Sequence, residues 1–600
     1  MKLSDYVIQF VARQGVRHIF LLPGGGSMHL VDSVGRCREI EYVCNLHEQG
    51  CAVAAEAYAQ YSNRLGVALV TTGPGGTNTL TGVAAAWLDS TPCLFLSGQV
   101  KRADMKGARG VRQMGFQEID IVRVVASITK YAVTITDPAT VRYHLEKAVF
   151  LAGNGRPGPV WVDIPLDVQA SQVDEDRLPG LGPSEFQQAW DEADLREEAL
   201  RAIELFNSSE RPVILIGNGV RLAGALDTCR ELCELLRAPI LTTWKAIDFL
   251  GEGHPLFAGR PGSVGQRGAN FTLQNSDWLL TLGARLDYGQ TGYNRDAFAR
   301  SARKVVVDID PAEIAKHSAA PDLGVCADAG AFIRALLSSK GAVMPKDRSG
   351  WLARAMEWKR QYPPVLREYW DKQDYVDNYV LIDVLSEEMS PEDLLIPGSS
   401  GACSEITMQA FRVKEGMRIL NSEGLGPMGF AVPATIGGCL ASGGRRTVSV
   451  DGDGGFHMNA QELETVRRLR LPIKFFVLNN NGYGSIRATQ RSYFDGHLVA
   501  CDPGSGLTLP NTLRIAEAYG IRTAQIRNHS NIRELVREVL RESGPAVCEV
   551  LVSPYQLTQP RVSSAQRPDG TMVSKPLEDM WPFLERTEFN AHMLIPTVDD

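Results

Sequence analysis

Short apolar runs recur along the chain, and each ends abruptly in glycine, asparagine or serine before a helical pattern begins. Examples are VRHIFLLPGGG, LGVALVTTGPGG, RPVILIGNG, DWLLTLGARLD, RRTVSVDGDGG and PIKFFVLNNNG. Runs that are apolar throughout, rather than alternating, are typical of strands buried on both faces of a sheet. Strands that alternate with helices predict parallel α/β sheets, in which ligands bind at the carboxyl ends of the strands. The glycine clusters lie at those ends.

Two polar segments divide the chain. ASQVDEDRLPGLGPSEF (residues 170–186) is acidic and rich in Pro and Gly, and SSKGAVMPKDRSG (residues 338–350) is polar without periodicity. The division predicts an α/β protein with three doubly wound parallel-sheet domains, over residues 1–170, 187–340 and 365–555. The remaining C-terminal tail, residues 556–600, has the proline content and charge of an extended segment on the surface.

Composition narrows the class of protein. The 600 residues are 44% hydrophobic and 22% charged, as in ordinary globular proteins, and the net charge of −8 argues against a nucleic-acid partner. No apolar run approaches the roughly 18 residues that span a bilayer, and the first helix lacks a signal-peptide pattern. The eleven cysteines lie mostly in apolar stretches without a C-x-x-C pair. We therefore expect a cytoplasmic protein without membrane or nucleic-acid partners.

Polar residues follow two of the predicted strands in the third domain. Asp453 in TVSVDGDGG and Asn480 in FFVLNNNG each come directly after an apolar run, with a helical pattern between them. In such a β–α–β unit the strands are neighbours and parallel, so the loops after them lie side by side. The resulting oxygen ligands suit Mg²⁺ or Ca²⁺ rather than zinc, and Mg²⁺ often completes its shell with phosphate oxygens. A plain strand, tight turn and helix is the alternative.

GDGGFHMNAQELETVRRLRLPIKFFVLNNNGYGS resembles the thiamine-diphosphate signature, in which G-D-G is followed after a spacer by N-N. The match extends over roughly residues 3–555, in the family's order of pyrimidine-binding, central and diphosphate-binding domains. The resemblance implies thiamine diphosphate as the cofactor, which acts as an electron sink. It implies that Mg²⁺ is held by Asp453, Asn480 and the carbonyl of Gly482. Asp451 is then a structural turn-former.

The family also needs a glutamate on a different domain, which contacts the aminopyrimidine ring of the cofactor. Glu48 in VCNLHEQGCAVAAEAYAQ takes that place, and the following segment is similar to the acetohydroxyacid (acetolactate) synthase and pyruvate oxidase branch. A carboxylate stabilised by a helix N-terminus is the alternative, and His47 is expected to be a structural neighbour. In the family this glutamate and the metal-binding aspartate, here Glu48 and Asp453, meet across a dimer interface, which implies a homodimer or homotetramer.

Further segments complete the cofactor site that the resemblance implies. SEGLGPMGFAVPATIGG contains Met428, which would support the bent cofactor, and Gly426, whose carbonyl would receive its 4′-amino group. GSSGACSEI stands at the diphosphate-binding position, with serines where relatives often have Gln and His. The other expected cofactor-binding residues are Ser399, Ser400, Gly401, Gly452, Gly454, Gly455, Tyr483 and Gly484.

MGFQEIDIV resembles the acetohydroxyacid synthase segment that faces pyruvate. Phe116 would line the pocket for the methyl group, and Gln117 would contact the carboxylate or oxyanion. A packing Phe and a surface Gln are the alternative. The activity that follows is decarboxylation of a 2-ketoacid, pyruvate, and transfer of the two-carbon unit to a carbonyl acceptor, as in acetolactate synthase.

The acceptor side departs from the synthases. Thr489 stands where they usually carry a Trp, which predicts a larger and more polar acceptor. The basic segment KRADMKGARGVR presents Arg109 and Arg112 to an anionic acceptor; a solvated loop is the alternative. A second hypothesis is therefore transfer to a nucleotide-linked keto sugar, as in the yersiniose-type branched-sugar enzymes of this family.

Three other kinds of protein stay open as alternatives, because fold alone does not select a reaction. They are a 2-ketoacid decarboxylase or oxidase, a hydrolase of cyclic diketones, and a non-catalytic protein of the thiamine fold. The presence of Glu48, Asp453 and Asn480 disfavours the last of these.

The sequence of the central domain suggests FAD as a further cofactor. LLTLGARLDYGQTG and VVVDIDPAEI resemble flavin-binding members, and Gly259, Gly262 and Gly265 keep the spacing of another flavin-contacting loop. Its usual Met-His is Ser263-Val264 here, so a site without flavin is the alternative. A bound flavin would have a structural role. The expected FAD residues are Gly217, Gly219, Gly283, Arg285, Asp287, Asp308 and Asp310.

Overall fold

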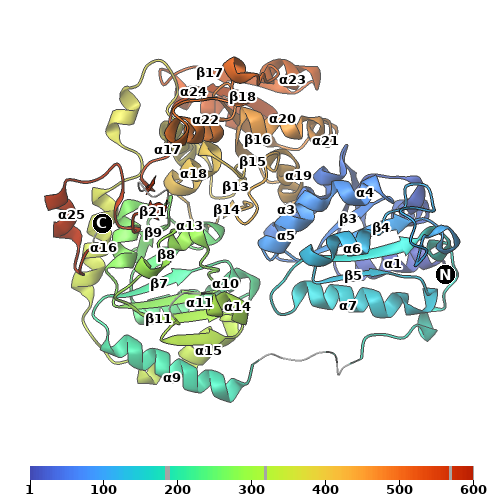
Figure 1. Ribbon diagram of the computed structural model, residues 1–600, viewed down its shortest axis with the longest axis horizontal. Coiled ribbons are helices and arrows are strands. Elements are labelled where there is room, and N and C mark those ends of the chain that lie inside the picture. The colour runs from blue at the N-terminus through green and yellow to red at the C-terminus, as the bar shows by residue number, and fades with distance from the viewer. Residues whose placement is uncertain (183–184, 186–189, 317–319, 567–570, 599–600) are drawn as a thin grey trace.

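The computed structural model describes residues 1–182, 185, 190–316, 320–566 and 571–598. Parts of the predicted first linker (residues 183, 184 and 186) and the predicted start of the second domain at residue 187 lie outside the described residues. Figure 1 shows three layered α/β units, coloured blue to cyan, green to yellow, and yellow to red along the chain. Each is built on a six-stranded sheet whose strand pairs are all parallel. The predicted fold class is confirmed.

The first sheet has the strand order β2-β1-β3-β4-β6-β5. Its strands are β1 (His18–Leu21), β2 (Glu41–Cys44), β3 (Gly66–Val70), β4 (Cys93–Gln99), β5 (Tyr131–Thr134) and β6 (Val160–Pro165). The main helices are α1 (Leu3–Arg13), α2 (Met28–Arg36), α3 (Glu48–Ser62), α5 (Leu80–Leu88) and α7 (Val141–Gly153). The central strands β3 and β4 are buried along their whole length, as the continuous apolar runs predict.

The third sheet repeats this order as β14-β13-β15-β16-β18-β17. Its strands are β13 (Leu394–Leu395), β14 (Arg418–Ile419), β15 (Thr447–Gly452), β16 (Ile473–Asn479), β17 (Arg522–Ile526) and β18 (Ala546–Leu551). Its helices include α17 (Asn378–Glu388), α18 (Ala402–Ala410), α19 (Ala431–Ala441), α20 (Asp453–Met458), α21 (Leu463–Arg468), α22 (Gly484–Tyr493), α23 (Thr512–Ala518) and α24 (Ile532–Arg541). The first and third units therefore share one topology.

The central sheet differs, with the order β12-β11-β10-β7-β8-β9. Its strands are β7 (Pro212–Ile216), β8 (Ile240–Thr242), β9 (Phe257–Gly259), β10 (Trp278–Leu282), β11 (Arg303–Asp308) and β12 (Leu323–Cys326). Its helices include α9 (Glu192–Ser208), α11 (Leu226–Leu236), α12 (Arg267–Gln274), α13 (Tyr288–Thr291), α14 (Pro311–Ala315) and α15 (Ala329–Ser338). This is the strand order of dinucleotide-binding folds. Successive strands are added outward on one side of the sheet from β7 to β9, and on the other side from β10 to β12. A ligand crevice is expected at the carboxyl ends of β7 and β10.

The first and third units pack directly on each other through α3 and α19 (Figure 1). A Cβ built on Gly437 of α19 would lie 2.0 Å from the carbonyl oxygen of Ala54 in α3, so only glycine allows this approach. One apolar core runs across both units and includes Phe20 and Phe95 from the first unit and Phe456 and Phe475 from the third. This shared core fixes the two units relative to each other.

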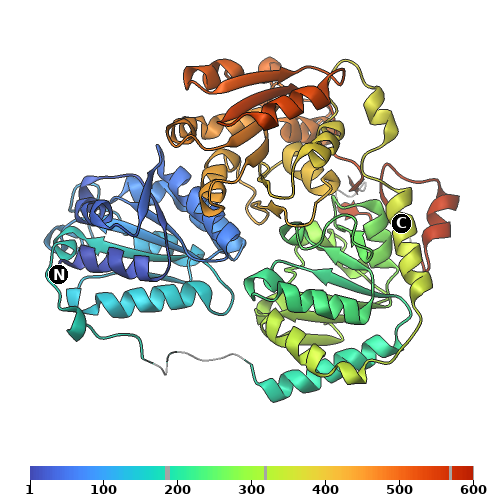
Figure 2. The same ribbon diagram turned by 180° about the vertical axis from the view of Figure 1, so that it is seen from behind.

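The C-terminal tail is packed, and the expectation of an extended surface segment is wrong. Its strand β19 (Arg561–Val562) pairs with β22 (Met580–Trp581), and helix α25 (Arg586–His592) follows. Leu577 and Phe589 join the core of the central domain. The buried Glu578 accepts hydrogen bonds from Gln274 Nε2 at 2.6 Å and from Arg300 Nη1 at 2.7 Å. The charged composition of the segment led to the wrong expectation, because a small set of apolar residues in it fills the core of a neighbouring domain. Figure 2 shows this tail against the central domain from behind.

Asp163 is a buried acid in the first sheet that gives a test of the fold. Its carboxyl accepts from Ser97 Oγ at 2.6 Å, Thr134 Oγ1 at 3.0 Å and Gln99 Nε2 at 3.2 Å. Burial raises its pKa from 3.8 to about 7. The folded state then holds a proton that the unfolded chain releases, so stability falls as pH rises between those two values.

We expect the Asp163→Asn variant to lose part of this pH dependence. Between about pH 5 and pH 8, the unfolding free energy of the wild type should fall by about 3 kcal/mol more than that of the variant, at 1.4 kcal/mol per pKa unit. Denaturant titrations of both proteins at the two pH values measure the difference. Identical pH dependence in the two proteins would show that the Asp163 carboxyl ionises normally.

Candidate active site

Glu48 is the first residue of α3, which begins where the chain leaves β2. His47 is the N-cap, and its Nδ1 accepts from Gln49 N at 3.1 Å, which fits its expected structural role. The Glu48 residue is 6% exposed, and its Oε2 accepts from Asn78 Nδ2 at 2.9 Å. A single hydrogen bond leaves this carboxylate with free acceptor capacity at the edge of the first domain.

Asp453 and Asn480 lie at the carboxyl ends of the neighbouring strands β15 and β16, which pair in parallel with Gly452 opposite Leu478. Asp453 is 3% exposed, and its two oxygens accept from Gly454 N at 2.9 Å and from Gly482 N at 3.2 Å. The Asn480 Oδ1 atom is buried and has no hydrogen-bond partner. Gly482 has φ +138°, a conformation that side chains rarely adopt. The loops thus bring together the residues predicted to hold a metal.

The electrostatics of this point favour a cation. Burial raises the pKa of Asp453 to about 6, against the lowering effect of the backbone N–H groups of Gly482 and Gly454. A buried carboxylate beside an unpartnered amide oxygen is stabilised by a positive charge between them. Among the described residues, no three His, Cys, Asp or Glu side chains form a metal cluster. A cation here would therefore rely on Asp453, Asn480, backbone carbonyls and oxygens from outside the protein.

The Asp451 carboxyl has different partners from that of Asp453. Its Oδ1 accepts from Gly452 N at 2.9 Å and lies 3.8 Å from Cys403 Sγ. Burial raises its pKa to about 7. These contacts lie beneath the loop that leads into α18, and they agree with the structural role expected for Asp451.

The loop from Ser399 to Gly401 follows β13 and leads into α18, with Gly401 as the N-cap. Ser399 Oγ is buried without a hydrogen-bond partner, and Ser400 O accepts from Cys403 Sγ at 3.1 Å. A Cβ built on Gly426 would lie 3.1 Å from the carbonyl oxygen of Ser399. Two of the predicted cofactor segments therefore meet at one edge of the third sheet.

Met428 and Tyr483 approach the same edge. A Cβ built on Gly454 would lie 2.5 Å from the Tyr483 ring and 3.2 Å from Met428 Cε, so glycine is required there. Gly452 ends β15, Gly455 belongs to α20 and Gly484 begins α22. All the predicted cofactor-binding residues thus lie around the ends of β13, β15 and β16.

The predicted substrate residues are exposed in the single chain. Phe116 is 87% exposed, and Gln117, Arg109 and Arg112 are also exposed on the segment after β4. Glu118 organises this segment, because its carboxylate accepts from Lys106 N at 2.5 Å, Met114 N at 2.8 Å and Gly115 N at 3.2 Å. Within the part of the chain that the structure describes, these side chains are therefore open to solvent.

Two of the proposed acceptor residues, Thr489 and Arg109, have local partners. Thr489, exposed on α22, donates to Ser485 O at 3.0 Å within its own helix. Arg109 Nη1 donates to Met105 O at 2.6 Å. Arg102, in the same basic segment, is paired with Asp167 at 2.7 Å and is a structural residue of the first domain.

The expected flavin residues surround two cavities at the carboxyl ends of β7, β10 and β11. One has a volume of about 540 Å³ and is lined by Arg285, Asp287 and Asp310. The other, of about 210 Å³, shares Arg285 and Asp287 and reaches Gly219, Gly283 and Asp308. Gly217 lies behind the lining, where its N–H donates to Leu282 O at 2.9 Å. The crevice is at the reversal of strand order, as the topology predicts.

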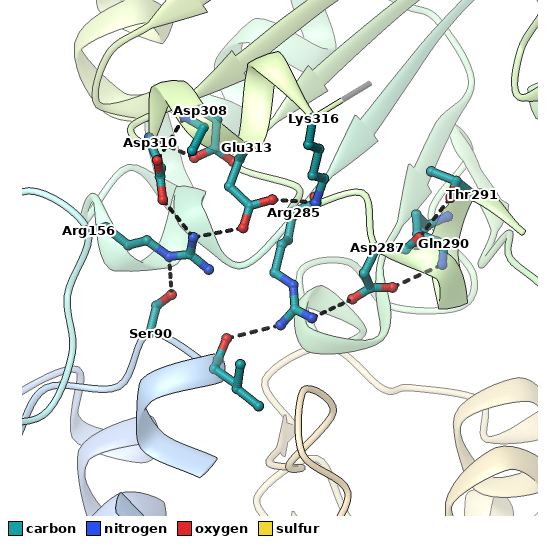
Figure 3. Close-up of polar contacts among 12 residues, drawn as sticks. Ser90, Arg156, Arg285, Asp287, Gln290, Thr291, Asp308, Asp310, Glu313 and Lys316 are labelled. Carbon is teal, nitrogen blue, oxygen red and sulfur yellow. Dashed lines mark hydrogen bonds and ion pairs between the residues drawn. The ribbon is translucent and has the colours of Figure 1, made fainter. Parts of the chain in front are cut away.

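Charged pairs cross the larger cavity (Figure 3). Arg156 of the first domain reaches Asp310 Oδ2 at 2.9 Å and Glu313 Oε1 at 2.8 Å, and Lys316 also pairs with Glu313. Arg285 Nη2 lies 3.5 Å from Asp287 Oδ2. The basic side chains Arg156, Arg285 and Lys316 of the cavity wall are thus paired with its acidic side chains.

Two further features bear on a flavin. Burial raises the pKa of Asp308 to about 6, and its Oδ1 accepts from Asp310 N at 3.0 Å. The loop that contains Gly259, Gly262 and Gly265 is covered by the C-terminal tail, since Val562 N donates to Ser263 O at 2.7 Å.

Models of the thiamine pyrophosphate enzyme family match all three parts of the chain. The N-terminal TPP binding domain matches residues 1–124, the central domain residues 200–336, and the C-terminal TPP binding domain residues 399–550. A probable acetolactate synthase large subunit of Methanocaldococcus jannaschii is 32% identical over 567 residues, which cover 93% of each chain. The chain belongs to the thiamine pyrophosphate enzyme family.

Two plant proteins are also similar to this chain over most of its length. The chloroplastic acetolactate synthase 1 of Nicotiana tabacum is 33% identical over 94% of this chain and 83% of its own length. A probable chloroplastic acetolactate synthase 2 of Oryza sativa subsp. japonica is 34% identical over 94% of this chain and 85% of its own length. The resemblance drawn from GDGG…NNNG is confirmed for the family and for the cofactor, thiamine diphosphate. In this thiamine pyrophosphate enzyme the individual roles of Glu48, Asp453 and Asn480 are still predictions.

Sequence reasoning missed two contacts of this thiamine pyrophosphate enzyme that join its domains. Lys245 Nζ donates to Asp89 Oδ2 at 3.2 Å and to Asn421 O at 2.7 Å, and Asp89 Oδ1 accepts from Gly424 N at 2.8 Å. This junction of all three domains holds the segment that leads to Gly426. The second contact joins Glu462, in the middle of the signature, to the backbone N–H groups of Leu46 and His47 in the first domain. No local pattern marks a residue whose partner is hundreds of positions away.

Proposed function

We propose that this protein is a carboligase that uses thiamine diphosphate to decarboxylate pyruvate and to transfer the two-carbon unit to a second 2-ketoacid, as acetolactate synthase does. The observation that carries the proposal is that one chain contains both sets of residues that the cofactor needs, one on the first domain and one on the third. Glu48 on the first domain has free acceptor capacity, and the third domain has Asp453 beside an unpartnered Asn480 Oδ1.

The residues present fit the cofactor and a magnesium ion. Asp453, Asn480 and the carbonyl of Gly482 would hold Mg²⁺, and the unpartnered Ser399 Oγ would donate to the diphosphate. Bound thiamine diphosphate supplies a carbon nucleophile and an electron sink for the decarboxylation of a 2-ketoacid. Glu48 would accept a hydrogen bond from the aminopyrimidine and hold or return its proton. The Gly426 carbonyl and Met428 would orient that ring.

We also propose a homodimer or homotetramer with active sites shared between chains. Within one chain, Glu48 contacts Asn78, whereas Gly426 and Met428 contact Ser399 and Gly454 of their own domain. The exposure of Phe116 is consistent with a partner chain that closes the pocket. At a Mg²⁺ concentration too low to support Asn480→Ala alone, a mixture of the Glu48→Gln and Asn480→Ala variants, after subunit exchange, should regain up to about a quarter of the wild-type activity, because one site of each mixed dimer is intact. No recovery despite demonstrated exchange would contradict shared sites.

FAD in the central cavities, with a structural role, is a further proposal. The dinucleotide-binding strand order and the two cavities, which six of its seven expected residues line, support it. Binding would require Arg156 and Arg285 to exchange their present carboxylate partners for the ligand. The visible absorbance of the purified protein tests this proposal: a flavin spectrum supports it, and its absence after reconstitution with FAD contradicts it.

Location and acceptor complete the proposal. All eleven cysteines are free thiols, which supports a cytoplasmic location. Among the described residues, no helix has the length and apolar character that crossing a bilayer requires. The relatives named above are acetolactate synthases, so the keto-sugar acceptor, the simple decarboxylase or oxidase and the diketone hydrolase are not favoured.

The test of the function is incubation of the purified protein with thiamine diphosphate, Mg²⁺ and pyruvate alone, with CO₂ and acetolactate measured together. We expect both products, since a second pyruvate serves as the acceptor. Slow CO₂ release with little acetolactate would contradict the 2-ketoacid acceptor. An absence of CO₂ would contradict the roles of Phe116 and Gln117 in binding pyruvate.

A further inference from the structure

Glu462 lies at the end of the short 3-10 helix η11 (Ala460–Glu462), which follows α20 in the third domain. It is fully buried, with 0% exposure. Its carboxylate reaches across the domain boundary to the segment that precedes Glu48. Oε1 accepts from Leu46 N at 2.8 Å and from His47 N at 3.1 Å, and Oε2 accepts from Asn45 Nδ2 at 2.8 Å. Thr465 Oγ1, at 2.9 Å, completes its partners.

These contacts fix the backbone where α3 begins. Leu46 and His47 immediately precede Glu48, and their N–H groups find their acceptor on another domain. A Cβ built on Gly50 would lie 2.6 Å from Glu462 Oε1, so the first turn of α3 is packed closely against this carboxylate. The position of Glu48 is therefore set from the third domain.

We propose that Glu462 is a positioning residue, which holds the segment Asn45–His47 so that the Glu48 carboxylate meets the cofactor in the correct place. The proposal rests on the proposed catalytic role of Glu48. Its content is geometric: the reach of the side chain and its two acceptor oxygens matter, and its charge does not. A displacement of about 1 Å at a reacting group can lower a rate by about 100-fold.

Two substitutions separate geometry from charge. Glu462→Gln keeps the reach and an acceptor for Leu46 N and His47 N. Its new NH₂ group can donate to Asn45, because Asn45 Oδ1 is buried without a partner and the amide can turn over. Glu462→Asp keeps the charge but is one methylene too short to reach the two N–H groups. Glu464→Asp is the matched control, since Glu464 is two residues away and pairs with the exposed Arg467.

The first readout is independent of catalysis. Hydrogen–deuterium exchange at the Leu46 and His47 amides should accelerate in Glu462→Asp and stay slow in Glu462→Gln and in Glu464→Asp. Exchange in the peptide that contains Asn480 should be equal in all four proteins. Unchanged protection of Leu46 and His47 in Glu462→Asp would overturn the proposal.

The second readout is the decarboxylation of pyruvate with thiamine diphosphate and Mg²⁺. We expect kcat to fall by about 10- to 100-fold in Glu462→Asp and to stay within about threefold of the wild type in Glu462→Gln, with an unchanged affinity for the cofactor. The reverse order, an active Asp and an inactive Gln variant, would overturn the proposal in favour of a role for the charge. Full activity of Glu462→Asp beside an inactive Glu48→Gln would overturn this inference alone. A fully active Glu48→Gln would instead overturn the proposed function on which it rests.

Discussion

We expect the Glu48→Gln variant to decarboxylate pyruvate at least about 100-fold more slowly than the wild type, as befits the loss of a positioned acid–base group. Gln keeps the length of the side chain and can still accept from Asn78 Nδ2, but a carboxamide cannot hold and return a proton. The measurement is the steady-state rate of CO₂ release at saturating thiamine diphosphate and Mg²⁺. The affinity for Mg²⁺ should not change, because Asp453 and Asn480 lie on another domain.

Glu56→Gln is the matched control on the same helix. Glu56 is fully buried two turns after Glu48. Burial and the neighbouring Asp89 carboxylate raise its pKa to about 8, so this side chain is largely protonated at neutral pH. A carboxamide resembles a protonated carboxyl, and this variant should keep its activity. An equal loss in both variants would indicate damage to α3, whereas a full rate in Glu48→Gln would exclude its catalytic role.

The second large effect is expected at Asn480. Asn480→Ala removes the buried Oδ1 that lacks a protein partner and should lower the affinity for Mg²⁺ by at least about 10- to 100-fold, the range seen even for residues that only support metal ligands. The concentration of Mg²⁺ that gives half-maximal activity at fixed thiamine diphosphate measures this loss. High Mg²⁺ should restore much of the rate, since Glu48 is intact.

Asn481→Gly provides the control for this substitution. Asn481 is exposed, and its φ of +58° suits glycine. Its backbone carbonyl, which accepts from Arg487 Nη2 at 2.9 Å, is retained in the variant. We expect an unchanged requirement for Mg²⁺. If Asn480→Ala shows the same requirement as the wild type, the unpartnered oxygen is not a metal ligand.

The sequence predicts those parts of the fold and the site that depend on short spacings. Continuous apolar runs such as TVSV and FFVL identify buried parallel strands, because such strands are apolar on both faces. Asp453 and Asn480 are separated by one helix, and a β–α–β unit necessarily brings the ends of its strands together. For the same reason the crevice between β7 and β10 can be expected from the glycines that follow each strand.

Contacts between distant segments could not be predicted in this way. The bond from Leu46 N to Glu462 joins residues 416 positions apart, and QELE has the pattern of an ordinary solvated helix start. Arg102 resembles a free cation in its basic segment, yet it pairs with Asp167, which lies 65 positions later, just after β6. The tail has a charged, proline-containing sequence, but a few apolar residues such as Phe589 decide where it packs. Phe116, which is predicted to line a substrate pocket, is 87% exposed in one chain.

The dependence of CO₂ release on the cofactor tests the central claim most directly. The purified protein is freed of metal and cofactor by dialysis against a chelator and is then assayed with pyruvate. We predict that CO₂ release falls to background, stays there with Mg²⁺ alone, and returns when thiamine diphosphate and Mg²⁺ are added together. Release that persists without them, or that no combination restores, would contradict the assignment of this chain as a thiamine-diphosphate-dependent carboligase.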